Sequence, residues 1–164
     1  MSVAISDQPG YSYLHRFVQR ALEARGEELE FVVLFGSRVK DTWRRDSDFD
    51  VLIGLREDDG KRFHERLADF EGFMERQIEP FIYSRSEIQN LFEQRHTLLL
   101  EALADGWVLF DRGGWAVLRA ELEAWQRDNK ALRRPHGWWL DPSLKPDSGG
   151  SEPSPPGAAG MEKG

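Results

Sequence analysis

Apolar and polar positions along residues 11–132 follow helical and extended periods in alternation. Apolar residues that recur every three or four positions predict four helices, at 11–25, 61–76, 84–104 and 114–131. Short apolar runs rich in β-branched and aromatic residues predict four strands, at 31–35, 48–55, 77–83 and 107–110. Glycine and capping residues separate these blocks. The alternation predicts an α/β fold.

Two short motifs lie where predicted strands end and begin. Gly36 and Ser37 follow the strand that ends at Phe35, and a glycine turn lets backbone N–H groups approach a phosphate closely. Asp48 and Asp50 open the next strand, and residues two apart on a strand point to the same face. Neighbouring carboxylates repel unless a cation joins them, and their hard oxygen atoms suit Mg²⁺. The motifs predict metal-assisted phosphoryl or nucleotidyl transfer.

The spacing of these motifs resembles that of a known family. Gly36-Ser37, ten intervening residues and Asp48-x-Asp50 resemble the GSx10DxD signature of the polymerase-beta-like nucleotidyltransferase superfamily. The short chain resembles its minimal branch, the MntA-like proteins that are often paired with HEPN toxins. The resemblance implies a small mixed sheet flanked by helices on its far side. It also implies that ATP is the substrate, that Gly36 and Ser37 cradle its phosphates, and that Asp48 and Asp50 hold two Mg²⁺ ions, with Mn²⁺ as the alternative.

A third acidic residue belongs to the family pattern, on a later strand. Glu79 is the candidate, and the helix predicted over 61–76 gives the strand–helix–strand path that would return it to the first two carboxylates. The resemblance implies that Glu79 completes the metal site and helps to activate the attacking hydroxyl. Pro80 cannot donate to a β-ladder and therefore places this strand at a sheet edge or at its own start. The alternative for Glu79 is an exposed carboxylate on an edge strand.

The other site residues also have structural interpretations. Asp48 and Asp50 could lie in a solvated turn, but the Gly-Ser spacing favours the metal site. Ser37 could cap a helix, which is compatible with phosphate binding because a helix N-terminus attracts anions. Four cations, Arg38, Lys40, Arg44 and Arg45, flank the site and could meet the charge of the triphosphate. A solvated loop face explains them nearly as well, so only Arg38, next to the turn, is taken as the candidate.

Composition excludes several other classes of protein. The net charge of −7 argues against an extended nucleic-acid surface. The sequence contains no cysteine, which excludes disulfides, thiolate catalysis and zinc–thiolate sites. Residues 1–10 lack a basic stretch followed by an apolar one, and no apolar run approaches membrane-spanning length. We therefore expect a cytoplasmic protein with no membrane contact.

The composition changes beyond Arg134. Six of the eight prolines and six glycines fall from Pro135 onward. This change predicts a nucleotidyltransferase domain over 1–134 and a Pro/Gly-rich tail over 135–164 that is disordered from about residue 141. We expect Trp138-Trp139 to pack back on the domain, with a partner-binding anchor as the alternative.

The molecule that accepts the transferred nucleotide is predicted by elimination and from the resemblance. Polymerase-like relatives carry extra basic domains and antibiotic-modifying relatives a second helical domain, and this sequence shows no room for either. We therefore expect AMP to move from ATP to a hydroxyl on a partner protein. The resemblance implies that the partner is a HEPN toxin and that this protein is its antitoxin. Two alternatives stay open: a nucleotide- or partner-binding module without turnover, and a small-molecule nucleotidyltransferase of the aminoglycoside-modifying kind.

Overall fold

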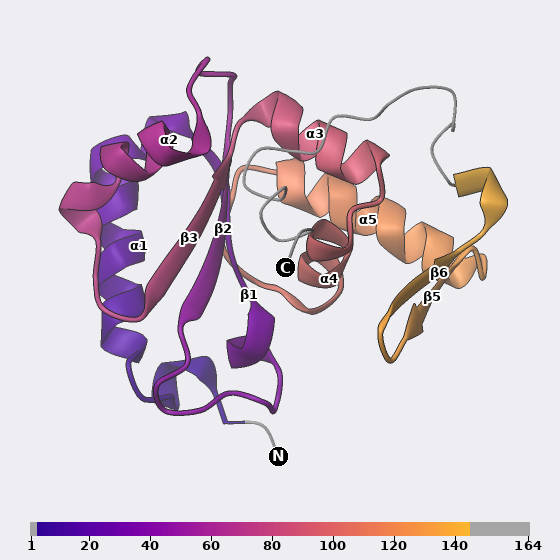
Figure 1. The fold of residues 1–164 in the computed structure, drawn as a ribbon, viewed down its shortest axis with the longest axis horizontal. Helices are drawn as coiled ribbons and strands as arrows, with labels where there is room; N and C mark the ends of the chain where they lie inside the picture. Colours follow the sequence, from indigo (N-terminus) through magenta and orange to yellow (C-terminus); the bar gives the residue numbers. More distant parts are fainter. Residues whose placement is uncertain (1–2, 145–164) are drawn as a thin grey trace.

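A four-stranded mixed sheet lies between two layers of helices in the computed structural model, which describes residues 3–144 (Figure 1). The strands are β1 (Leu29–Phe35), β2 (Phe49–Leu55), β3 (Ile78–Tyr83) and β4 (Trp107–Asp111). Their order is β3-β2-β1-β4, with β2 and β3 parallel and the other neighbours antiparallel. The predicted mixed α/β sheet is therefore confirmed, and Pro80 lies on an edge strand as expected.

Helices cover both faces of this sheet (Figure 1), where the sequence predicted cover on the far side. The helices are α1 (Tyr11–Arg25), α2 (Phe63–Asp69), α3 (Arg85–Glu93), α4 (Thr97–Asp105) and α5 (Gly114–Arg127). One apolar cluster joins α1 to one face, and a second joins α3, α4 and α5 to the other. Both faces need cover because β1 and β2 are apolar along nearly their whole length.

Two predicted helices differ in length from the observed ones. The helix predicted over 61–76 ends at Asp69 and is followed by a separate 3-10 turn. The helix predicted over 84–104 is two helices, α3 and α4, because Arg95 between them adopts a left-handed backbone with φ of 54°. The side chain of Arg95 stabilises this break by donating to the carbonyl oxygens of Phe92 and Leu144.

The C-terminal part of the described chain contains a β-hairpin. Strands β5 (Ala131–Arg134) and β6 (Gly137–Leu140) pair with each other. The Pro/Gly-rich segment predicted from residue 135 thus begins inside a hairpin. Residues Pro142–Leu144, which fall in the part predicted to be disordered, form a short 3-10 helix, and 145–164 lie outside the described residues. Trp138 packs against the helix layer as expected, whereas Trp139 is 39% exposed.

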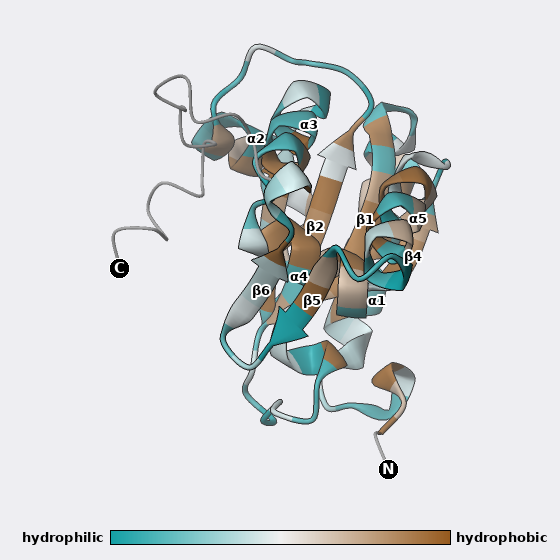
Figure 2. Ribbon diagram, turned by 90° about the vertical axis from the view of Figure 1, so that its right-hand side faces the viewer, coloured by the Kyte–Doolittle hydropathy of each residue, from teal (hydrophilic) through white to brown (hydrophobic). Residues whose placement is uncertain are grey.

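Hydropathy follows these layers (Figure 2): the central strands are hydrophobic and much of the outer helical surface is polar. The last residue of β4, Asp111, connects sheet and helix, because its carboxylate accepts hydrogen bonds from the backbone N–H groups of Gly113, Trp115 and Ala116 at the start of α5. Within residues 3–144, no helix combines the length and the apolar character needed to cross a membrane.

Candidate functional site

Asp50 stands where three segments of the chain meet. In the strand register, Phe35 of β1 lies on one side of Asp50 and Glu79 of β3 on the other. Phe49 is fully buried in the cluster beside α1, so Asp50 points to the opposite face. Asp48 immediately precedes β2, and both Asp48 and Glu79 are exposed. The fold therefore pairs the positions of Asp50 and Glu79 and places Asp48 at the entrance of the same strand. We call these three residues the carboxylate cluster.

Gly36 lies directly against Asp50. It begins a 3-10 helix, Gly36–Val39, with a left-handed φ of 81°. A β-carbon at this position would overlap the carboxylate of Asp50. Glycine therefore serves two purposes here, the turn and the close approach of the backbone to the carboxylate. Ser37 lies inside this short helix and does not cap it, since Phe35 is the residue before its start.

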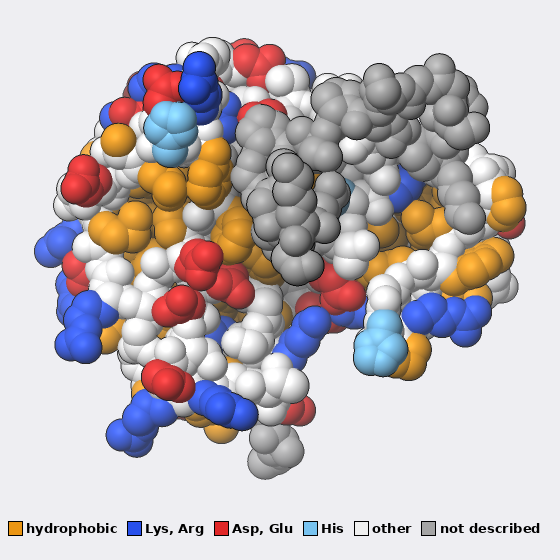
Figure 3. Space-filling model, viewed as in Figure 1, with side chains coloured by type: hydrophobic (Ala, Val, Ile, Leu, Met, Phe, Trp, Pro, Cys, Tyr) orange, Lys and Arg blue, Asp and Glu red, His pale blue; other side chains and the backbone are white. Residues whose placement is uncertain are grey.

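The electrostatics of Asp50 oppose its ionisation. Burial, followed by the negative charges of Glu79 and Asp48, raises its pKa to about 6. Figure 3 shows acidic side chains gathered on this face of the molecule, near the strand ends where β2 and β3 begin. A cation bound among the three carboxylates would remove this repulsion.

The donor chemistry of the carboxylate cluster fits Mg²⁺, which prefers carboxylate oxygen atoms. As the side chains lie, no group of three or more His, Asp or Glu residues within the described part of the chain is placed to hold a metal ion. Asp48 and Glu79 are exposed, so their side chains can rotate toward Asp50 without disturbing the core. The set therefore fits a metal in chemistry and requires side-chain movement to close around it.

Arg38, which the sequence suggested as a ligand of the triphosphate, is buried against the loop before Asp48. Its side chain is only 1% exposed, and its guanidinium donates to the carbonyl oxygens of Ser47 (2.8 and 3.0 Å) and Arg45 (3.2 Å). The same group lies 4.1 Å from the centroid of the Phe49 ring, and burial lowers its pKa. Arg38 therefore holds the loop that leads into Asp48, and its interpretation as a phosphate ligand stays a prediction.

A cavity of about 550 Å³ opens beside Gly36. Its floor is largely apolar, and charged side chains stand at its rim. The lining residues are Phe35, Gly36, Lys40, Arg95, His96, Thr97, Leu98, Glu101 and Asp105. The sequence interpretation left Lys40 out of the site, because a solvated loop face explained its charge as well as a phosphate did. Its proximity to the α4 residues of this cavity arises only in the folded chain.

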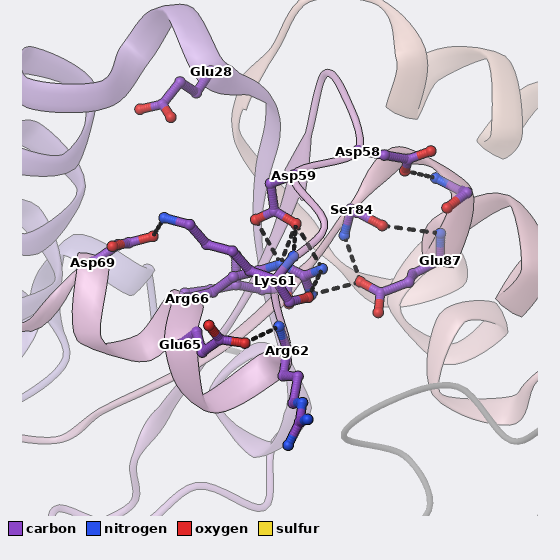
Figure 4. Close-up of polar contacts among 12 residues, drawn as sticks. Glu28, Asp58, Asp59, Lys61, Arg62, Glu65, Arg66, Asp69, Ser84 and Glu87 are labelled. Carbon is purple, nitrogen blue, oxygen red and sulfur yellow. Dashed lines mark hydrogen bonds and ion pairs between the residues drawn. The ribbon is translucent and has the colours of Figure 1, made fainter.

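A second charged group, the Arg66 cluster, lies at the opposite end of the sheet (Figure 4). The guanidinium of Arg66, only 3% exposed, donates to the carboxylates of Asp59 and Glu87 and to the carbonyl oxygens of Lys61 and Ile82. A cavity of about 380 Å³ adjoins it. Because the donors of Arg66 are used within the protein, we assign the cluster a structural role: it fastens the loop after β2 to β3 and to the start of α3.

Solved structures with a similar chain fold have low sequence identity. A protein of Sulfolobus solfataricus assigned as a nucleotidyltransferase is 16% identical, with a TM-score of 0.48 over 63% of this chain and 81% of that one. A toxin–antitoxin complex with AMP-PNP is 16% identical (TM-score 0.43; 70% and 87% covered), and the MntA–HepT toxin–antitoxin complex is 12% identical (0.41; 69% and 84%).

No curated protein sequence matches this chain. The sequence family described as "Polymerase beta, Nucleotidyltransferase" matches residues 18–113, which is more than half of the chain. The matched part includes all four strands of the sheet, the Gly36 turn and the carboxylate cluster. This chain belongs to the polymerase beta nucleotidyltransferase family.

Proposed function

We propose that this protein is a metal-dependent nucleotidyltransferase that moves AMP from ATP to an acceptor hydroxyl. The observation that carries the proposal is the convergence at Asp50, where the Gly36 turn and Glu79 meet the same carboxylate. Membership of the family supports the reaction class. The raised pKa of Asp50 supports the metal, because a site that repels its own ionisation attracts a cation.

In this proposal each residue of the site has a separate role. Asp48 and Asp50, with Glu79 as the third ligand, would hold two Mg²⁺ ions, which when bound stabilise the entering and leaving oxygen atoms of an in-line displacement. The backbone at Gly36 and the hydroxyl of Ser37 would orient the β- and γ-phosphates. The acceptor oxygen bonds to the α-phosphorus, the bond to the bridging oxygen breaks, and pyrophosphate leaves. Glu79, exposed and beside Asp50, is the candidate to take the hydroxyl proton.

The acceptor in this proposal is a hydroxyl on a partner protein. This part of the proposal rests on the resemblance to the minimal branch, since the signature from Gly36 to Asp50 belongs to the superfamily as a whole. On this proposal the partner is a HEPN toxin, and transfer of AMP would inactivate it, which would make this protein an antitoxin.

The test is transfer of label from α-labelled ATP with Mg²⁺, with and without the product of a neighbouring gene. Asp48→Ala is compared with Asp41→Ala, which removes the same charge from an exposed position in the same loop. We expect label on the neighbour with the wild type and with Asp41→Ala, and at least about 1,000-fold less with Asp48→Ala. Binding of ATP without transfer to any acceptor would instead support the binding module.

The cavity beside Gly36 favours a second candidate, a small-molecule acceptor, because about 550 Å³ is enough for a compact ligand. Its two carboxylates, Glu101 and Asp105, are already paired with Lys40 and Arg133, which lessens their attraction for a cationic antibiotic. Including an aminoglycoside in the labelling reaction distinguishes this candidate: label on the drug and none on protein would establish it.

A further inference from the structure

Three cationic side chains lie at the Gly36 end of the sheet, and they differ in what holds them. Arg38 is buried and bound to backbone carbonyl oxygens. Arg95 is likewise bound to the carbonyl oxygens of Phe92 and Leu144, and burial lowers its pKa. Lys40 is 42% exposed and pairs with side-chain carboxylates instead. Of the three, Lys40 can therefore change partners without loss of a backbone contact.

Lys40 is also fixed close to the turn by its main chain. Its N–H donates to the carbonyl oxygen of Ser37 at 3.0 Å, directly after the 3-10 helix, and its side chain lines the same cavity as Gly36. Its ammonium group lies 3.3 Å from a carboxylate oxygen of Glu101 and 4.0 Å from one of Asp105. Partly exposed pairs of this kind are weak and exchange readily.

The negative charges of Glu101 and Asp105 repel each other. The two residues lie four residues apart on one face of α4, in its last turns, where the helix dipole adds negative potential. Two cations from distant segments, Lys40 and Arg133, offset this charge.

Arg133, on the C-terminal hairpin, is held more firmly than Lys40. Its guanidinium donates to both carboxylate oxygens of Asp105, at 2.7 and 2.6 Å, and also contacts Glu101. It lies 5.3 Å from the ring centroid of Trp138, its partner across the hairpin. Hydrogen bonds from Arg133 hold the pKa of Asp105 below its usual range. With Arg133 in place, Asp105 stays paired and only one net negative charge remains on the two carboxylates when Lys40 moves away.

We propose that Lys40 binds the triphosphate of the nucleotide and that Arg133 is a positioning residue, which offsets one of the two negative charges of Glu101 and Asp105 and thereby weakens their hold on Lys40. The inference rests on the proposed function, since it names the positively charged side chain that binds the phosphates in that same site. It makes the C-terminal hairpin part of the nucleotide-binding apparatus, although the hairpin lies outside the part of the chain that the family matches.

The first experiment measures the affinity of the full chain for ATP and for AMP, with Mg²⁺ at low salt, by calorimetry. Lys40→Ala is expected to weaken ATP binding about 10-fold and AMP binding less than about 2-fold, because AMP lacks the β- and γ-phosphates. Arg44→Ala removes the same charge from an exposed position of the same loop and is expected to change neither by more than about 2-fold.

The second experiment tests the positioning role. Arg133→Ala leaves Lys40 alone with two carboxylates and is expected to weaken ATP binding about 3- to 10-fold. Adding Glu101→Gln and Asp105→Asn to Arg133→Ala removes those carboxylate charges and is expected to restore ATP affinity to within about 2-fold of the wild type. Arg134→Ala, on the next position of the same strand, is the control. A purely structural role for Arg133 would not be rescued by removing its partners.

The outcomes separate this inference from the function on which it rests. If the wild type binds no ATP, the proposed function fails and this inference fails with it. If the wild type binds ATP but Lys40→Ala leaves the ratio of ATP to AMP affinity unchanged, Lys40 is not the phosphate cation and only this inference is overturned. Loss of affinity in Arg133→Ala without rescue in the triple variant overturns the positioning role. Thermal unfolding of every variant identifies any that fails to fold, and Arg133→Gln, which removes the charge but keeps a long polar side chain, then replaces Arg133→Ala.

Discussion

The two ends of the central sheet carry acidic side chains in opposite electrostatic settings. In the carboxylate cluster, burial and like charges raise the pKa of Asp50 to about 6. In the Arg66 cluster, burial also opposes the charge of Asp59, but hydrogen bonds from Arg66 and from the backbone of Lys61 outweigh it and lower the pKa of Asp59. The Arg66 cluster pairs its charges within the protein, whereas the charges of the carboxylate cluster repel one another and, on the proposed function, would be offset by a bound cation. The first arrangement favours stability, and the second favours binding at the cost of stability.

The largest effect on stability is expected from Arg66→Ala. Removal of this buried guanidinium leaves Asp59 and Glu87 without their main partner, which costs about 3–5 kcal/mol of unfolding free energy. Urea denaturation measures the loss. Arg62→Ala, an exposed arginine of the same segment (Figure 4), should change stability by less than about 0.5 kcal/mol. A loss below about 1 kcal/mol for Arg66→Ala would contradict the structural role of the cluster.

Asp50→Asn is expected to act in the opposite direction and to stabilise the protein in the absence of divalent cations. Because the folded state raises the pKa of Asp50 from the usual value to about 6, the wild type loses stability as pH rises from about 4 through 6. Solvent screening of this partly exposed carboxylate limits the loss to about 1–2 kcal/mol. Asparagine carries no charge and avoids this loss. Denaturation at pH 7 should therefore show the variant to be more stable, and the difference should disappear below about pH 4. Equal stability of the wild type and Asp50→Asn at pH 7 would show that the charge of Asp50 does not destabilise the folded protein.

Gly36→Ala tests the contact between the turn and Asp50. The left-handed backbone alone costs about 1 kcal/mol for a residue with a side chain, and overlap with the Asp50 carboxylate adds to it, for a total of about 2 kcal/mol. In an Asp50→Ala background only the backbone cost should remain. A double-mutant cycle on unfolding free energies measures this difference, and strict additivity would show that the two residues do not touch.

The smallest effect is expected from Mg²⁺ itself. If the metal binds only the folded protein, ten times its dissociation constant stabilises the wild type by about 1.4 kcal/mol, which appears as a rise in melting temperature. Asp50→Asn should lose this response. The same addition should still stabilise Arg66→Ala, since the Arg66 cluster lies beside the ends of β2 and β3 and the carboxylate cluster beside their starts. Equal responses of the wild type and Asp50→Asn would place metal binding elsewhere.

Local patterns predicted the elements of the fold well, because periodicity and capping act over a few residues. The helix 11–25 is observed with the predicted bounds, and the helix predicted from residue 84 begins at Arg85, directly after its cap Ser84. The break at Arg95 was not predicted, since its cause includes a hydrogen bond to Leu144, 49 residues away. The hairpin of β5 and β6 was missed because its prolines and glycines resemble those of the tail that follows.

Part of the candidate site was predictable because it also depends on a pattern that is local in the sequence. The spacing from Gly36 to Asp50 is local, and the structure places the two residues in contact. The register that sets Glu79 beside Asp50 depends on the pairing of two strands, which the sequence suggested but could not fix. The burial of Arg38 and the approach of Lys40 to α4 depend on tertiary packing, and no pattern within the sequence marks either of them.

Strand β3 has a further consequence for the motions of the protein. It is an edge strand paired with β2 alone; Arg66 fastens one end of it through the carbonyl oxygen of Ile82, whereas Glu79 at the other end faces the repelling charge of Asp50. Opening of β3 should therefore begin at Ile78 and stop toward Tyr83. Amide hydrogen exchange should slow along the strand in that direction, and a nucleotide with its metal should slow it most at the first residues, so that ligand binding orders the edge of the sheet.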